Sequence, residues 1–197
     1  TDAGGFDGVR EALGSPIVRR WLIASSAGLA GLVAVQVHHV AAIEATGVSI
    51  GLASTMAGVR GLLSLPGRAA AGSVARRVGV VDALRLTYLT MTLGTLALAA
   101  GTVAWIWVFV LLTGLAFGSI APLQGLYAAE LYGERRIGTL MGMQQVVFGV
   151  AGAAGPLLLG LTIDWTGDYL TMLLLVAGLQ IVALVSFRDP SRVSPPG

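Results

Sequence analysis

The sequence contains no cysteine and no lysine, and only 11% of its residues are charged. Without cysteine there is no disulfide framework, no thiolate metal site and no catalytic thiol. The two histidines are too few to argue for a structural metal site, and we expect neither metal nor cofactor. The net charge of +2 is small, and it gives no ground for nucleic-acid binding.

Apolar sequence is what the chain has in abundance. Hydrophobic residues make up 55% of it, and they gather in six runs at 21–43, 49–65, 84–100, 105–128, 138–163 and 169–187. Each run has about 17 to 26 residues, which at about 1.5 Å per residue crosses or nearly crosses a hydrocarbon core of about 30 Å. The composition therefore predicts an all-α, multi-pass membrane protein with six transmembrane helices.

The arginines fix a topology for these runs. All but Arg60 of the twelve cationic residues flank alternate connections. They are Arg10, Arg19 and Arg20 before the first run, Arg68, Arg76, Arg77 and Arg85 between the second and third, Arg135 and Arg136 between the fourth and fifth, and Arg188 and Arg192 after the sixth. The other connections carry Glu44, Asp164 and Asp168. The positive-inside rule places both termini in the cytoplasm, which divides the chain into a lead-in (1–20), a membrane bundle (21–187) and a tail (188–197).

The two halves of the bundle share a weak internal repeat. A shift of 86 residues aligns Gly28-Leu29-Ala30 with Gly114-Leu115-Ala116 and Glu44 with Glu130, and a shift of 88 aligns Gly79 with Gly167. One repeat holds three runs, an odd number, so the two copies have opposite orientations in the membrane. Inverted repeats of this kind are typical of secondary transporters.

Three segments resemble signatures of the major facilitator superfamily. They are GRAAAGSVARRVG at 67–79, GPLLLGLTIDWTGDY at 155–169 and ELYGERR at 130–136. The first is similar to the family's cytoplasmic loop motif, through Gly67, Arg68, Gly72, Arg76, Arg77 and Gly79. It departs from the family at Arg76, where the family usually carries an aspartate.

The resemblance implies the C-terminal six-helix half of a twelve-helix transporter in a bacterial-type inner membrane, working by alternating access. Its partners would be the lipid bilayer, a small-molecule substrate, and an N-terminal six-helix half or a second copy of the chain. The protein would not be an enzyme. Intramembrane serine proteolysis is also excluded by the residues: Ser119 lacks the following glycine that such a nucleophile needs, and both histidines lie in the first run.

Arg60 lies about eleven residues into the second run, or about 16 Å by helical rise. A charge near the bilayer centre costs at least about 2.5 kcal/mol, so it should face water, a counter-ion or a substrate. No acidic residue lies deep within any run. Two interpretations stay open: Arg60 binds substrate in a cavity, or it pairs with helix carbonyls or with an acid from a missing half.

Other polar side chains mark the first, fourth and fifth runs. The expected substrate-binding set is Arg60 with Gln36, His39, Gln124, Gln144 and Gln145. In the resembled family these helices border the central cavity. Histidine also titrates near neutral pH, so His39 is a candidate for proton coupling. His38 lies about 100° away and is expected to mark a helix contact instead.

The single mid-membrane cation favours a small organic anion such as a mono- or dicarboxylate, as in the oxalate/formate and monocarboxylate carriers of the resembled family. Two alternatives remain: a drug or cation efflux carrier, and a truncated six-helix module that does not transport. Glycines are expected to allow close helix approach, at Gly114 and Gly118 and at Gly149, Gly152 and Gly155. Residues 6–17 form either a short amphipathic helix or a linker.

Overall fold

The computed structural model describes residues 6–132 and 137–187, which are almost entirely helical. The helices of the described residues are α1 (Phe6–Gly14), α2 (Pro16–Glu44), α3 (Ile50–Val78), α4 (Val80–Ala99), α5 (Val103–Tyr132), α6 (Ile137–Thr166) and α7 (Leu170–Ser186). Each of the six apolar runs lies within or largely within one of the helices α2 to α7, which confirms the all-helical class. The lead-in forms a helix, α1, rather than a linker. Arg135, Arg136 and the tail from Arg188 lie outside the described residues.

The sequence predicted a loop between the second and third runs, and this prediction is wrong. The motif at 67–79 continues α3 as far as Val78, and only Gly79, in the left-handed region with a φ of 87°, separates α3 from α4. Arg68, Arg76 and Arg77 therefore lie on a helix that extends beyond its apolar run. Alanine and arginine favour this continuation because both have high helix propensity.

Length and hydropathy identify the membrane-crossing helices only in part. Among the described residues, three helices are long and apolar enough to cross a bilayer: Pro16–Glu44, Val103–Leu131 and Gly138–Thr166. Leu170–Ser186 is apolar but shorter, and α3 carries four arginines. These helices make the chain a multi-pass membrane protein, and six spans stay a prediction.

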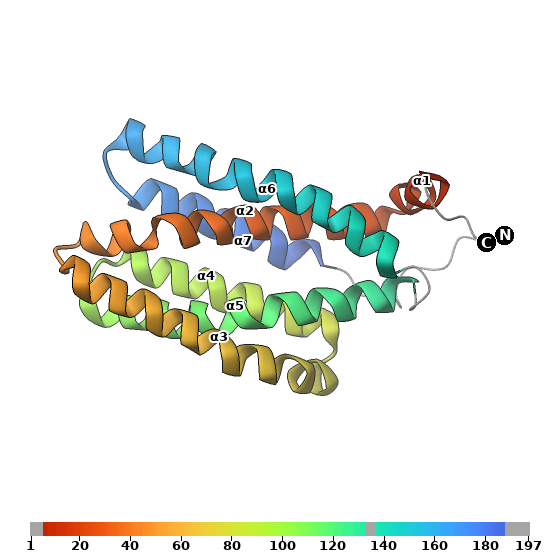
Figure 1. The fold of residues 1–197 in the computed structure, drawn as a ribbon, viewed down its shortest axis with the longest axis horizontal. Coiled ribbons are helices and arrows are strands. Elements are labelled where there is room, and N and C mark those ends of the chain that lie inside the picture. Colours follow the sequence, from red (N-terminus) through yellow and green to blue (C-terminus); the bar gives the residue numbers. More distant parts are fainter. Residues whose placement is uncertain (1–5, 133–136, 188–197) are drawn as a thin grey trace.

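Two groups of helices form the bundle. α2 packs against α6 and α7, α5 packs against α3 and α4, and α4 joins the groups by packing against α7. The turns that follow α2, α4 and α6 lie together at one end (Figure 1). The other end, which holds the start of α2 and the end of α3, carries the described arginines apart from Arg60; we call it the arginine-rich end.

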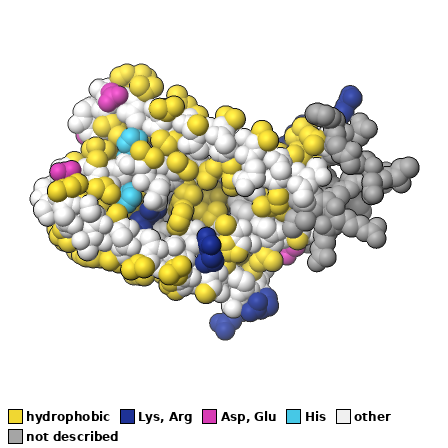
Figure 2. Space-filling view, viewed as in Figure 1, with side chains coloured by type: hydrophobic (Ala, Val, Ile, Leu, Met, Phe, Trp, Pro, Cys, Tyr) yellow, Lys and Arg dark blue, Asp and Glu magenta, His cyan; other side chains and the backbone are white. Residues whose placement is uncertain are grey.

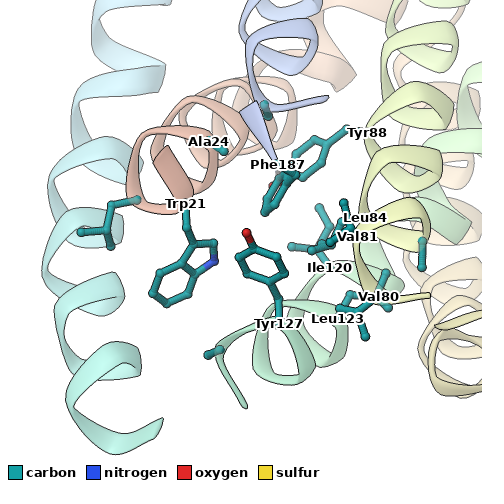
Figure 3. Close-up of a cluster of buried hydrophobic side chains, with 14 of the residues drawn as sticks. Trp21, Ala24, Val80, Val81, Leu84, Tyr88, Ile120, Leu123, Tyr127 and Phe187 are labelled. Carbon is teal, nitrogen blue, oxygen red and sulfur yellow. The ribbon is translucent and has the colours of Figure 1, made fainter. Parts of the chain in front are cut away.

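Four aromatic side chains lie within the hydrophobic core near the arginine-rich end (Figure 3). The Tyr127 ring lies between Trp21 and Phe187, with centroid distances of 6.3 and 5.5 Å. Tyr88 stacks on Phe187 at 5.6 Å. These four buried rings come from α2, α4, α5 and the residue after α7, so they join both groups of helices.

Glycines bring helix backbones close together, as expected for most of the positions singled out. A Cβ atom at Gly118 would meet the backbone oxygen of Ser64, and one at Gly155 would meet that of Ala30. Gly114 faces the Arg60 backbone in the same way. Gly149 was predicted wrongly, because open space surrounds it; Gly152 has only ordinary contacts.

One broad face of the bundle is hollowed (Figure 2). Apolar atoms fill much of the hollow, and arginine and histidine atoms lie at its side. α3 and α6 lie at the two edges of this face, with α2 and α5 between them (Figure 1). Large apolar side chains are exposed along α3 and α6, including Leu62, Leu65, Val150 and Leu157.

Candidate functional site

Arg60 projects from α3 to the neighbouring helices and is only 3% exposed. Its Nε donates a hydrogen bond to Oγ1 of Thr113 on α5, at 2.8 Å. Its Nη1 donates to Oε1 of Gln36 on α2, at 2.6 Å. The guanidinium thus links three helices. Gln36 is itself exposed, so it is the hydrogen-bonded neighbour on the solvent side of the guanidinium.

Two phenylalanines also contact the guanidinium. Its central carbon lies 5.5 Å from the ring centroid of Phe109 and 5.7 Å from that of Phe117, within the range of a cation–π interaction. Phe109, Thr113 and Phe117 recur every four residues, so they share one face of α5. Our sequence analysis missed these three residues, although that spacing is a signal that could have found them.

The charge of Arg60 has no acidic counterpart within the described residues. The ion pair that the described residues form lies elsewhere, at the start of α4, where Arg85 is 3.0 Å from Asp82. Nη2 of Arg60 is buried and has no hydrogen-bond partner among the described residues. A buried cationic donor without a partner is costly, and the remaining hydrogen-bonding capacity of this group can be satisfied by an anion.

His39 lies in the same neighbourhood and is 4% exposed. Its Nδ1 is 2.9 Å from the carbonyl oxygen of Val35 and 3.0 Å from that of Gln36, and its ring lies 6.1 Å from Phe109. Nε2 is buried without a partner among the described residues. We call the following group the Arg60 site: Gln36, His39, Arg60, Phe109, Thr113 and Phe117.

His38 has a different environment, as its position on the helix predicted. Nε2 of His38 lies 3.2 Å from the carbonyl oxygen of Pro156 on α6. His38 therefore makes a contact between α2 and α6, and the sequence-based expectation is confirmed.

The predicted glutamines form a second polar group, which we call the glutamine cluster: Trp21, Ser25, Tyr88, Gln124 and Gln144. Oε1 of Gln124 accepts hydrogen bonds from Nε1 of Trp21 at 2.7 Å, from Oγ of Ser25 at 3.2 Å and from Nε2 of Gln144 at 3.0 Å. Nε2 of Gln124 donates to the Tyr88 hydroxyl at 3.5 Å. These buried side chains join α2, α4, α5 and α6.

The structure therefore divides the expected binding set. Gln36, His39 and Arg60 come together, whereas Gln124 lies eleven residues beyond Thr113, about 16 Å along α5. Gln145 is exposed on α6, and within the described residues no hydrogen bond joins it to either group.

The motif residues 67–79 lie towards the arginine-rich end, away from the Arg60 site. Gly67 allows close approach to the Leu115 backbone, and a Cβ at Gly72 would lie 3.6 Å from an Arg76 nitrogen. Nη2 of Arg76 donates a hydrogen bond to the Ser73 hydroxyl at 2.9 Å. Gly67 therefore packs α3 against α5, whereas the Arg76 contact lies within α3 itself. No cluster of three histidine or acidic side chains suited to a metal occurs in the described part of the chain.

Comparisons with known proteins agree with this architecture. A family model described as Major Facilitator Superfamily matches residues 17–197. An uncharacterised MFS-type transporter of Bacillus subtilis (strain 168), YcxA, is 33% identical over 92 residues. That similarity spans 45% of this chain and 22% of the length of the relative.

Proposed function

This chain belongs to the Major Facilitator Superfamily, whose members are transporters rather than enzymes, and from that premise we propose that it carries a small organic anion across a membrane. In this proposal it forms the C-terminal six-helix half of a secondary transporter. The observation that carries the anion assignment is the partly unpaired, buried guanidinium of Arg60, which bonds to Gln36 and Thr113 on the neighbouring helices.

Packing supports the proposed inverted repeat of α2–α4 and α5–α7. The contact of α2 with α6 corresponds to that of α5 with α3, and the contact of α2 with α7 corresponds to that of α5 with α4. Gly79 and Gly167, aligned by the repeat, both have positive φ, of 87° and 75°. Such a repeat places a substrate site near the middle of the bilayer, where alternating access exposes it to each side in turn.

The apolar edges of the hollow support the proposed second six-helix unit. Exposed leucines on α3 and α6 would lie against that unit or against lipid. The Arg60 site would then form one wall of a cavity between two units. We propose that Gln36, His39 and Arg60 contact the substrate, and that the glutamine cluster holds the helices together.

The proposed orientation follows the arginines. With the arginine-rich end in the cytoplasm of a bacterial-type cell, both termini face inward and the membrane is the inner membrane. Arginines at both ends of the bundle would have contradicted this orientation, but the described arginines other than Arg60 lie at one end (Figure 1).

Uptake into liposomes tests the proposal directly. The protein that carries this chain is purified in detergent, reconstituted, and offered radiolabelled acetate, lactate, succinate, an organic cation and a neutral sugar. We expect uptake of at least one carboxylate and none of the cation. Uptake of the cation alone would replace our proposal by drug or cation efflux, and no uptake of any solute would favour a non-transporting module.

A further inference from the structure

The tautomer of neutral His39 can be assigned from its neighbours. Nδ1 lies within hydrogen-bond distance of two carbonyl oxygens, those of Val35 and Gln36. A carbonyl only accepts, so Nδ1 carries a proton and donates it to this pair. In the neutral ring Nε2 then holds a lone pair and is an acceptor. That acceptor is buried without a partner among the described residues.

The unpaired acceptor of His39 belongs to the same site as the unpaired donor of Arg60. Gln36 bonds to both residues, through its carbonyl oxygen to His39 and through its side chain to Arg60. Phe109 contacts both as well. A ligand that satisfies this site must therefore offer an acceptor to Nη2 of Arg60 and a donor to Nε2 of His39.

A plain carboxylate meets only half of this requirement, because its oxygens are acceptors. It would bind Arg60 and leave the histidine acceptor buried and unpaired. A carboxylate with a neighbouring hydroxyl meets both demands. Sites built to bond a substrate hydroxyl strongly reject the analogue that lacks it, because the buried partner is then left unpaired.

We propose that His39 is a specificity-determining residue that accepts a hydrogen bond from a hydroxyl next to the substrate carboxylate, so that the site selects 2-hydroxy acids over plain acids. The inference rests on the proposed anion transport and narrows it. Arg60 binds the carboxylate, and Nε2 of His39 accepts a hydrogen bond from the adjacent hydroxyl. The exposed Gln36 side chain moves aside or rebonds as the substrate enters.

The test compares acids that differ by one hydroxyl. Uptake of glycolate is compared with acetate, lactate with propionate, and malate with succinate, in liposomes that contain the protein carrying this chain. We expect kcat/KM to favour the hydroxy acid by about tenfold or more in the pair whose size fits. His39→Leu should remove this preference by slowing the hydroxy acid alone. His39→Gln, which retains an acceptor oxygen, should keep part of it.

His38→Leu is the matched control. His38 is the neighbouring histidine, but its Nε2 contacts the Pro156 carbonyl rather than the Arg60 site, so its loss should leave the preference unchanged. Size-exclusion profiles in detergent show whether each variant folds, and the comparison of acids in the parent protein needs no variant.

Three results would overturn the inference. Equal transport of hydroxy and plain acids by the parent protein would show that His39 does not bind the substrate hydroxyl. The proposed anion transport would still hold. A preference for dicarboxylates that His39→Leu abolishes would show that the histidine acts as a cation rather than as an acceptor. Absence of transport for every anion would remove the proposed function together with this inference.

Discussion

Replacement of Arg60 by methionine removes the charge from the Arg60 site and keeps an unbranched side chain. The change leaves no additional buried donor without a partner. The Thr113 hydroxyl still donates to the Phe109 carbonyl at 2.7 Å, and the exposed Gln36 can turn to water or headgroups. The substitution should therefore separate a role in function from a role in folding.

The effect on stability follows from two opposing terms. An arginine at the bilayer centre costs about 2.5 to 3.5 kcal/mol on insertion scales, and methionine removes that cost. The two lost hydrogen bonds are worth about 0.6 to 1.7 kcal/mol each inside a membrane. The terms are of similar size, so we expect the free energy of unfolding of Arg60→Met to stay within about 2 kcal/mol of the parent value.

The effect on transport should be much larger. Loss of a charge-assisted hydrogen bond to the substrate removes about 1.5 to 3 kcal/mol of binding. At about 1.4 kcal/mol per factor of ten, kcat/KM for the anion should fall about 10- to 140-fold. The kcat/KM of Arg60→Lys should lie between that of the parent protein and that of Arg60→Met, because one ammonium cannot reproduce the separate bonds of the guanidinium fork.

The assay measures uptake kinetics in liposomes and thermal unfolding in detergent for the same preparations. Gln180→Leu is the matched control, since Gln180 is also a buried polar residue with an unpaired nitrogen among the described residues, but lies on α7, where its amide oxygen accepts from Thr95 on α4. It should transport normally. Unchanged kcat/KM in Arg60→Met would remove Arg60 from the binding site, and collapse of its fold would make Arg60 a structural residue.

Three further predictions concern packing and orientation. Gly118→Val should push α5 away from the α3 backbone and lower the melting temperature in detergent, whereas Gly125→Ala, in open space, should not. Gln144→Leu should lower the free energy of unfolding by about 0.6 to 1.7 kcal/mol, measured by titration with a denaturing detergent; no loss would show that its bonds to the glutamine cluster are weak. A reporter fused after Arg77 should be cytoplasmic and one at Gly47 external, and the opposite result would invert the topology.

Hydropathy and charge predicted the helices but not where they end. Apolar runs locate the segments that lie in lipid. Backbone groups there must be hydrogen-bonded within the segment, so these segments are helical. The runs do not tell where the helix stops once it leaves lipid. The run 49–65 was found, yet α3 continues to Val78, since alanine and arginine sustain a helix in water as well.

The sequence predicted which side chains are unusual better than it predicted their partners. Arg60 stood out because charges are rare in apolar runs, and Gln36 and His39 followed from their shared helix face. Gln124 was assigned to the same site because it is a polar residue in the fourth run, which borders the central cavity in the resembled family. Depth along the helix was the missing quantity. Arg60 lies five residues before the end of its run and Gln124 four before the end of its own, so the runs place them at similar levels. In the structure α3 continues past its run to Val78, and Arg60 bonds to Thr113, eleven residues before Gln124.

The two polar groups differ in how completely they are bonded, and that difference separates structure from function. In the glutamine cluster, one oxygen of Gln124 accepts three hydrogen bonds from three other side chains, and none of its members has an unpaired buried side-chain atom among the described residues. Such a network holds helices together and has little left to offer a ligand. The Arg60 site keeps a donor and an acceptor unpaired. Within the described part of the chain, Gln180 also has an unpaired buried nitrogen, so one such atom does not mark a binding site. The Arg60 site differs because it combines an unpaired donor and an unpaired acceptor on two residues that both bond to Gln36 and contact Phe109. Because unpaired buried groups cost stability, this combination favours a ligand that completes both.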